Sequence, residues 1–290
     1  MSLKLFNPEA EEGQTDRVLV YGDPGIGKSR FALSLPPRFG NILYYAADDN
    51  AQFLSSISRA KRKRVWVITP QGDDAIVNFQ EFCDHDWKSL EGQTMADGRT
   101  FPQIGTIVVD TYSTVMERVL QEVANQGLSG AERHFYASAK DKGGQTIPNR
   151  GDYRGSDSIS MGYLDTLFDL QRHYNIVFVC HGTLKYVDDV CIGGGPSHPG
   201  RRMLTELPAR FSTVVRLVRE DVEIQEPEYH VENAVVAITE NDGRWVAKAR
   251  LENEEDPNPL AHVVLNQTGS NFWGMYESIY HPIHEEAVNG

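Results

Sequence analysis

The chain has 290 residues, of which 40% are hydrophobic and 24% are charged, and its formal net charge is −13. This composition is that of an ordinary soluble globular protein. The acidic balance argues against a protein that coats DNA through a strongly basic surface, although a local basic groove is compatible with it. The 3 cysteines are too few and too scattered for a disulfide framework. No apolar run is long enough to span a membrane, so we expect a cytoplasmic protein without a membrane partner.

Short apolar runs alternate with segments of helical spacing along most of the chain. The apolar runs predict buried strands at residues 17–21, 41–47, 65–69, 105–110 and 175–180. The segments between and after them predict helices at residues 28–35, 50–60, 73–90, 112–126 and 159–173. This alternation predicts an α/β fold with a mostly parallel central sheet and helices on both faces. Further strands predicted at 212–218, 228–239 and 244–250 indicate a strand-rich C-terminal part.

Three regions follow from these patterns. Residues 1–16 are polar and predict an N-terminal arm, residues 17–252 form the core, and residues 253–290 form a C-terminal tail without an assigned structure. Within the core, the polar and glycine-rich stretches 127–158 and 188–199 predict long loops, which in compact domains are usually functional or disordered.

The strongest motif follows the first predicted strand. It matches the phosphate-binding pattern G-x-x-x-x-G-K-[ST] in full, reading Gly22, Asp23, Pro24, Gly25, Ile26, Gly27, Lys28 and Ser29. A buried strand before it and a helix after it are the context that this motif requires. The glycines let backbone N–H groups turn inward around phosphates, and the helix adds its positive end. We therefore expect a nucleotide site that extends to Arg30, with Lys28 on the β- and γ-phosphates and Ser29 on Mg²⁺.

Polar residues end three of the other predicted strands. Asp110 is expected to hold the magnesium shell. Thr111 follows it where many ATPases have a Glu, so the carboxylate that positions the attacking water must come from elsewhere. Asp48 is our first choice, with Asp49 as the other candidate and helix capping as the alternative role. His181 ends the fifth strand, where it either senses the γ-phosphate or is a structural residue.

Four segments in this order, GDPGIGKS, ILYYAADD, TIVVDT and VFVCH, resemble the RecA-like ATPase core. More narrowly, the chain resembles the phage-encoded AAA-type ATPases grouped with the Sak-four single-strand annealing and recombination proteins. The segments DYRG at 152–155, LPARF at 207–211 and AKAR at 247–250 support this likeness, which covers about residues 17–252. Two positions depart from the family pattern: Ser212 stands where an Asp is usual, and Asp48 stands where the family has a catalytic Glu.

The resemblance implies ATP as the nucleotide, Mg²⁺ as the cofactor, and assembly into a ring or filament. It also implies a role in recombination or single-strand annealing, with a recombination or single-strand-binding protein as a partner. A Lys-x-Arg pair in such assemblies often reaches the ATP of a neighbouring subunit. Lys248 and Arg250 would share one face of a strand, where two cations can neutralise γ-phosphate charge. A solvated strand face with salt bridges to nearby glutamates is the alternative.

The loops after the fourth and fifth strands face DNA in RecA-like proteins. Here they combine cations for the nucleic-acid backbone with aromatic rings for stacking, the ingredients of single-strand binding. The residues concerned are Arg133, Phe135, Tyr136, Lys140, Lys142, Arg150, Tyr153, Arg154, Lys185, Arg201 and Arg202. Solvated loops are the alternative, since acidic residues lie among them. Two other functions stay open: a nucleotide-switched module that binds a protein with slow turnover, and a small-molecule kinase whose lid carries the arginines of 127–158.

Overall fold

The computed structural model describes residues 15–48, 54–55, 57–72, 74–126, 146–170, 172–187, 190–224, 230–249, 258–266 and 269–280. The strands are β1 (Arg17–Gly22), β2 (Asn41–Ala46), β3 (Val65–Ile68), β4 (Ile104–Asp110), β5 (Asn175–Val187), β6 (Val190–Pro196), β7 (Thr213–Ile224), β8 (His230–Ile238) and β9 (His262–Val264). The helices are α1 (Lys28–Ala32), α2 (Arg59–Arg62), α3 (Ala75–Asp84), α4 (Tyr112–Gln126), α5 (Arg150–Leu170), α6 (Met203–Ala209) and α7 (Ser270–Tyr280). The short 3₁₀ helices include η2 (Pro37–Phe39) and η4 (Trp87–Leu90).

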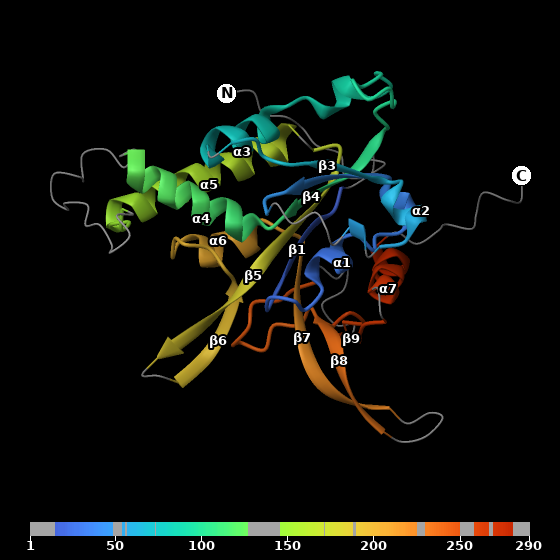
Figure 1. Cartoon of the computed structure of the whole chain (residues 1–290). Helices are drawn as coiled ribbons and strands as arrows, with labels where there is room; N and C mark the ends of the chain where they lie inside the picture. Colours follow the sequence, from blue (N-terminus) through green and yellow to red (C-terminus); the bar gives the residue numbers. More distant parts are fainter. Residues whose placement is uncertain are drawn as a thin grey trace, which may run out of the picture.

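The strands form one central sheet in the order β3-β2-β4-β5-β1-β7-β8-β9, and β6 pairs with β5 outside this order (Figure 1). The six strands from β3 to β7 in this order pair in parallel, and β8 and β9 add antiparallel strands at one end. The mostly parallel α/β fold with a strand-rich C-terminal part is thus confirmed. None of the helices in the described part of the chain is both long and apolar enough to cross a membrane.

Helices cover both faces of the sheet, and each face has its own apolar core. Helices α3, α4, α5 and α6 pack on one face, against alternate strand residues such as Leu19 and Tyr45. Helices α1 and α7 pack on the other face, against the intervening residues such as Val20 and Tyr44. Strands buried on both faces explain the continuous apolar runs in the sequence, because such strands have no solvent side.

Helix α5 begins inside the predicted loop 127–158, so the loop prediction is wrong for its last nine residues. A reciprocal cap explains the earlier start. The side chain of Asn149 accepts the backbone N–H of Gly151 and of Asp152, at 2.8 and 3.2 Å, and Asp152 in turn accepts the N–H of Asn149 at 2.9 Å. Such a pair satisfies the N–H groups that a helix start otherwise leaves unpaired. Residues 127–145 lie outside the described part of the chain.

Other helix predictions are too long, including 28–35, because α1 ends at Ala32. The predicted helix 73–90 is interrupted, because α3 ends at Asp84 and a separate 3₁₀ turn, η4, follows. Within the described part of the predicted helix 50–60, only the start of α2 at Arg59 is α-helical. Asp86 accepts the N–H of Ser89 at 3.3 Å and so starts η4 as a new element rather than continuing α3.

A β-hairpin replaces much of the predicted loop 188–199. Strand β5 continues past its predicted end at 180 and pairs with β6, and this hairpin extends beyond the sheet, as does the hairpin of β7 and β8 (Figure 1). The glycines of β6 allow close packing: a Cβ on Gly194 would lie 2.5 Å from the ring of Trp245. The described part of 244–250 makes isolated bridges at Trp245 and Lys248 only, so the strand predicted there is wrong.

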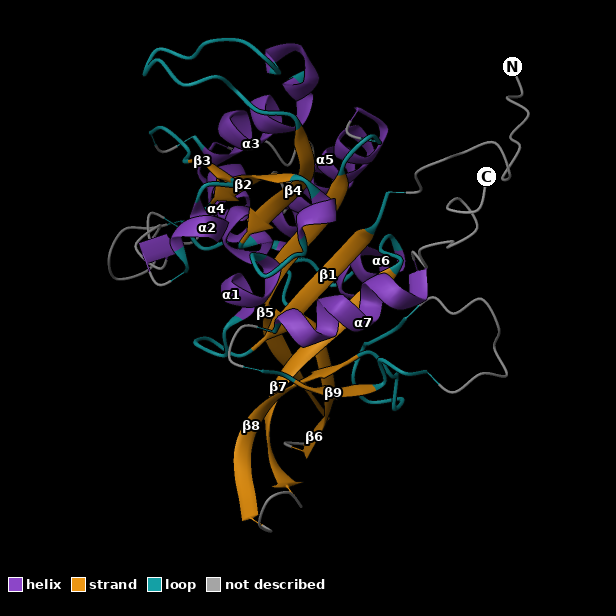
Figure 2. Ribbon diagram, turned by 90° about the vertical axis from the view of Figure 1, so that its right-hand side faces the viewer, coloured by secondary structure: helices purple, strands orange, loops and turns teal. Residues whose placement is uncertain are grey.

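Part of the segment 253–290 joins the folded core, although its sequence pattern left it as an unassigned tail. Strand β9 pairs with β8, and α7 lies against α1 and β1 (Figure 2). The side chains of Phe272, Trp273 and Tyr276 are almost completely buried. These aromatic residues give α7 an apolar side, which packs into the core on the sheet face that α1 also covers.

Candidate nucleotide-binding site

The phosphate loop lies at the carboxyl end of β1. Gly25 and Gly27 have φ angles of 76° and 99°, in the left-handed region that favours glycine. A Cβ on Gly22 would lie 2.5 Å from the carbonyl oxygen of Leu217 on β7, so only glycine fits there. The three glycines therefore allow the backbone to turn from β1 into α1 within a few residues, as an anion-binding loop requires.

The ammonium group of Lys28 is folded onto its own loop. Its Nζ donates to the carbonyl oxygens of Gly22 and Asp23, at 2.9 and 2.8 Å. Burial lowers the pKa of Lys28, and the charge of Asp110 opposes this effect. A buried cation whose hydrogen bonds go to neutral carbonyls can exchange them for the oxygens of a phosphate.

The Asp110 carboxyl group ends β4 and is buried beside two hydroxyl groups. Tyr44 donates its hydroxyl hydrogen to Asp110 Oδ2 at 2.5 Å, and Ser29 also hydrogen-bonds this carboxyl group. Burial raises the pKa of Asp110, while the hydrogen bonds from Ser29 and Tyr44 lower it. The peptide bond between Asp110 and Thr111 is cis. The structure thus brings Ser29 and Asp110, both predicted to bind magnesium, into direct contact.

These oxygen donors fit the predicted Mg²⁺. A hydroxyl and a carboxylate are the ligand types that this cation takes beside a nucleotide. The buried carboxyl group of Asp110, whose pKa is raised, would gain a compensating positive charge from the ion. When bound, the ion would neutralise charge on the phosphates.

Strand β5 lies between the phosphate-loop strand β1 and the magnesium strand β4. His181 on β5 pairs in register with Gly22, so the topology places it at the mouth of the phosphate loop. Its Nδ1 is buried and has no hydrogen-bond partner among the described residues. Ser113 accepts the backbone N–H of His181 at 3.0 Å and donates to the carbonyl of Ser197 at 2.8 Å. Ser113 therefore connects the start of α4 to β5 and to the residue that follows β6.

One cavity of about 1180 Å³ contains most of the predicted site. Asp48 lies in it, two residues beyond the end of β2 and half-buried, while Asp49 lies outside the described residues. The predicted residues that line the cavity are Pro24, Gly25, Ile26, Gly27, Lys28, Ser29, Arg30, Asp48, Asp110 and His181. Further lining residues come from β7, β8 and the segment between β9 and α7.

Lys248 lies away from this cavity. It forms an isolated bridge with Val214, near the start of β7, and its Nζ donates to the carbonyl of the last residue of α6 at 3.5 Å. Strand β7 meets the phosphate loop at Leu217, which is about 10 Å further along the strand. Arg250 lies outside the described residues. A role for this pair in the site of a neighbouring subunit stays a prediction.

The residues proposed for DNA contact are only partly described. The cations and rings of residues 127–145 lie outside the described part of the chain. Lys185 is exposed on the β5–β6 hairpin, and Tyr153 is exposed on the first turn of α5. Arg202 forms an ion pair with Glu206 at 2.6 Å on α6.

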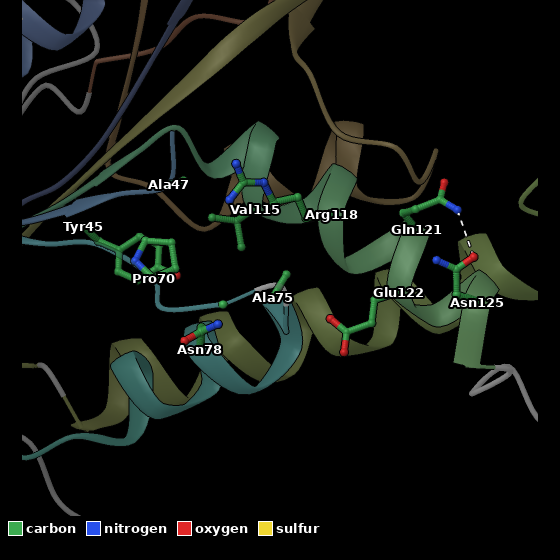
Figure 3. A pocket seen from close by; sticks show the side chains of 11 residues that line it. Tyr45, Ala47, Pro70, Ala75, Asn78, Val115, Arg118, Gln121, Glu122 and Asn125 are labelled. Atoms are coloured by element: carbon green, nitrogen blue, oxygen red, sulfur yellow. Dashed lines mark hydrogen bonds between the residues drawn. The ribbon is translucent and has the colours of Figure 1, made fainter. Parts of the chain in front are cut away.

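A second cavity, of about 530 Å³, lies on the opposite face of β2 (Figure 3). Tyr45 lines it whereas its neighbour Tyr44 lines the first cavity, because successive side chains of a strand alternate between faces. Figure 3 shows Arg118 reaching over this cavity from α4. Its lining includes none of residues 22–30, so the phosphate-binding chemistry belongs to the first cavity.

Sequence reasoning missed two polar residues of the site. In the sequence, Tyr44 is one residue of an apolar strand. It lies four residues before Asp48, and this even spacing could have indicated that both side chains face the same cavity. Ser113 had no such signal, because its partners His181 and Ser197 are 68 and 84 positions away in the sequence.

A mostly parallel sheet with a phosphate loop after β1, a carboxylate at the end of β4 and one strand between them defines a P-loop NTPase. The sequence model of a family described as "AAA domain" matches residues 14–251. The chain therefore belongs to the AAA domain family, and this membership indicates an ATP-binding domain of the ATPase type. No curated protein matches the sequence.

Proposed function

We propose that this protein hydrolyses ATP with Mg²⁺. The observation that carries the proposal is the convergence of Lys28, Ser29 and Asp110 in one cavity with Asp48 and His181. This set supplies a cation for the phosphates, oxygen ligands for the metal, a carboxylate near the attacking water and a polar group for the γ-phosphate.

Each side chain has a separate task in the proposed reaction. Lys28 exchanges its loop carbonyls for the β- and γ-phosphate oxygens. Asp48 accepts a hydrogen bond from the attacking water and orients it towards the γ-phosphate. His181, which lines the cavity, contacts the γ-phosphate. Because an aspartate is shorter than a glutamate and holds the water less well, we expect slow turnover in the absence of a stimulating partner.

The partner that we propose is single-stranded DNA, in recombination or single-strand annealing of a phage in the host cytoplasm. Exposed Lys185 and Tyr186 on the β5–β6 hairpin support this part of the proposal, since cations and aromatic rings are what a single strand binds to. The base of that hairpin is held by Ser113, close to Asp110, so nucleotide and hairpin are close enough to affect each other. We further propose that the protein acts as a ring or filament, together with a recombination or single-strand-binding protein.

Steady-state ATP hydrolysis with and without single-stranded DNA tests both parts. At about 50 mM salt we expect DNA to raise the rate several-fold, and less at about 150 mM, because phosphate contacts weaken with salt. Lys28→Ala should lower the rate by about 100-fold or more under every condition. Unchanged turnover in Lys28→Ala would refute the site. Turnover that DNA does not stimulate at either salt concentration would refute the DNA partner, and tight ATP binding without turnover would favour a nucleotide switch.

A matched pair of variants locates the DNA contact. Tyr186 and Val231 are both 56% exposed, each on one of the two projecting hairpins. Tyr186→Ala should lose the DNA stimulation while keeping the basal rate, and Val231→Ala should keep both. Equal stimulation in the two variants would remove the β5–β6 hairpin from the DNA site.

A further inference from the structure

The C-terminal helix α7 is attached to the helix that carries the phosphate loop. The indole Nε1–H of Trp273 donates to the carbonyl of Phe31 on α1 at 2.8 Å. The rings of Phe272 and Trp273 lie 5.1 and 5.0 Å from the ring of Phe31. All three side chains are at most 2% exposed. Figure 2 shows α7 lying along this side of the molecule, although it is outside the residues 14–251 that the AAA family covers.

This attachment matters because α1 is weak by itself. It has five residues and no side-chain cap at its N-terminus. Helices shorter than about 12 residues are marginal without tertiary contacts. Helix α7 thus contributes packing that holds α1, and with it Lys28 and Ser29, in place.

The turn before α7 reaches the nucleotide cavity itself. Leu265, Asn266 and Gly269 line the same cavity as Lys28. Leu265 is held to β8 by a hydrogen bond from its N–H to the carbonyl of Val235 at 2.8 Å. At Gly269, with a φ angle of 73°, a Cβ would lie 2.8 Å from the ring of Phe31, so glycine is needed for the turn to pack this closely.

The two ends of the cavity differ in chemistry. Lys28, Ser29 and Asp110 mark the end that takes phosphates and metal. The wall from β7, β8 and the segment after β9 combines the apolar side chains of Val235 and Leu265 with the polar ones of Arg219, Glu232, Asn233 and Asn266. Leu217 also lines the cavity, but it lies beside Gly22 at the phosphate end. A base, which has flat apolar faces and a polar edge, suits such a mixed wall.

We infer that residues 258–266 and 269–280 complete the nucleobase subsite, with the base lying against the side chains of Leu265 and Val235. This inference rests on the proposed binding of ATP at the phosphate loop. It assigns the specificity for a nucleoside, as distinct from a bare polyphosphate, to a segment outside the AAA domain.

Binding of two probes separates the base from the phosphates. Mg²⁺-ATP contacts both ends of the cavity, and Mg²⁺-tripolyphosphate contacts only the phosphate end. Leu265→Ala should weaken Mg²⁺-ATP binding by about ten-fold, the cost of losing one apolar wall. Its affinity for Mg²⁺-tripolyphosphate should be unchanged. Lys28→Ala should weaken both ligands, and Leu265→Met should bind both as the native chain does.

Val264→Ala is the matched control, because Val264 is the neighbouring residue, is 37% exposed and does not line the cavity. It should bind both probes as the native chain does. If Leu265→Ala weakens both probes equally or neither, the inference is wrong while the phosphate site stands. If the native chain binds neither probe, the proposed function itself fails. Calorimetric titration of the full chain measures all of these affinities.

Discussion

His198 is a buried histidine whose hydrogen bonds determine its protonation state. The N–H of Gly200 lies 3.0 Å from His198 Nδ1, a contact that favours the tautomer without a proton on Nδ1. The ring proton is therefore on Nε2, which lies 3.2 Å from Ser160 Oγ. Burial lowers the pKa of His198 to about 4. The neutral ring thus joins the turn after β6 to α5, near the base of the β5–β6 hairpin.

This geometry predicts that the folded chain loses stability in acid through His198. In the unfolded chain His198 takes up a proton near pH 6.5, whereas in the folded chain it does so only near pH 4. The unfolded state therefore binds more protons in this range, and the stability that neutral His198 contributes is lost as the pH falls from about 6.5 to 4. His198→Asn keeps an acceptor near Gly200 but cannot titrate.

Urea unfolding of the native chain and His198→Asn over this pH range checks the prediction. The difference in unfolding free energy between them should shrink as the pH falls. A difference that does not change with pH would contradict the buried neutral ring.

At the scale of elements, Asp16 makes the packing of α7 depend on pH. Its contribution to stability changes with pH in the opposite direction to that of His198. Tyr276 of α7 donates its hydroxyl hydrogen to Asp16 Oδ1 at 3.0 Å. Burial raises the pKa of Asp16 to about 6, although the hydrogen bond from Tyr276 and the charge of Arg38 lower it. The folded state thus holds a proton on Asp16 that the unfolded state releases near pH 4.

The contribution of Asp16 to the free energy of unfolding should therefore fall as the pH rises from about 4 to 6. Asp16→Asn keeps the acceptor oxygen and should gain stability relative to the native chain over that range. Tyr276→Phe removes the hydroxyl that favours the charged form, so the same fall should extend to higher pH. Unfolding by urea at a series of pH values measures both effects, and curves for Asp16→Asn and the native chain that stay parallel would argue against a raised pKa at Asp16.

At the scale of the whole molecule, the position of Lys248 makes the proposed assembly testable. Lys248 bridges to Val214 near the start of β7, while its own phosphate loop lies at the other end of the parallel strands. A catalytic role for Lys248 therefore requires the site of a neighbouring subunit in a head-to-tail contact.

Mixing two inactive variants tests this role. Lys28→Ala keeps Lys248, and Lys248→Ala keeps the phosphate loop. In an equal mixture, about a quarter of the sites combine an intact loop with an intact neighbouring lysine. We expect ATP hydrolysis to recover to about that fraction of the native rate, with sedimentation confirming that both variants assemble. A mixture as inactive as its components would refute a contribution in trans.

Much of this protein could be predicted from local sequence. The phosphate loop is contiguous, so residues 22–29 identify it without knowledge of the fold. The strands that carry Asp110 and His181 are short apolar runs, and their carboxyl ends meet at one edge because parallel strands share a direction. The AAA domain and the mostly parallel sheet follow from these two facts.

Tertiary structure alone decided what surrounds the loop. The contact between Phe31 and Trp273 joins residues 242 positions apart, and no periodicity in the chain indicates it. The hydrogen bond from Tyr44 to Asp110 and the pairing of Ser113 with His181 depend on which strands become neighbours in the sheet. Short-range patterns report local backbone preference and burial, whereas these contacts form only when separate elements pack together. Eight consecutive residues thus determine the phosphate loop. The rest of the cavity lining depends on the packing of residues that are distant in the sequence.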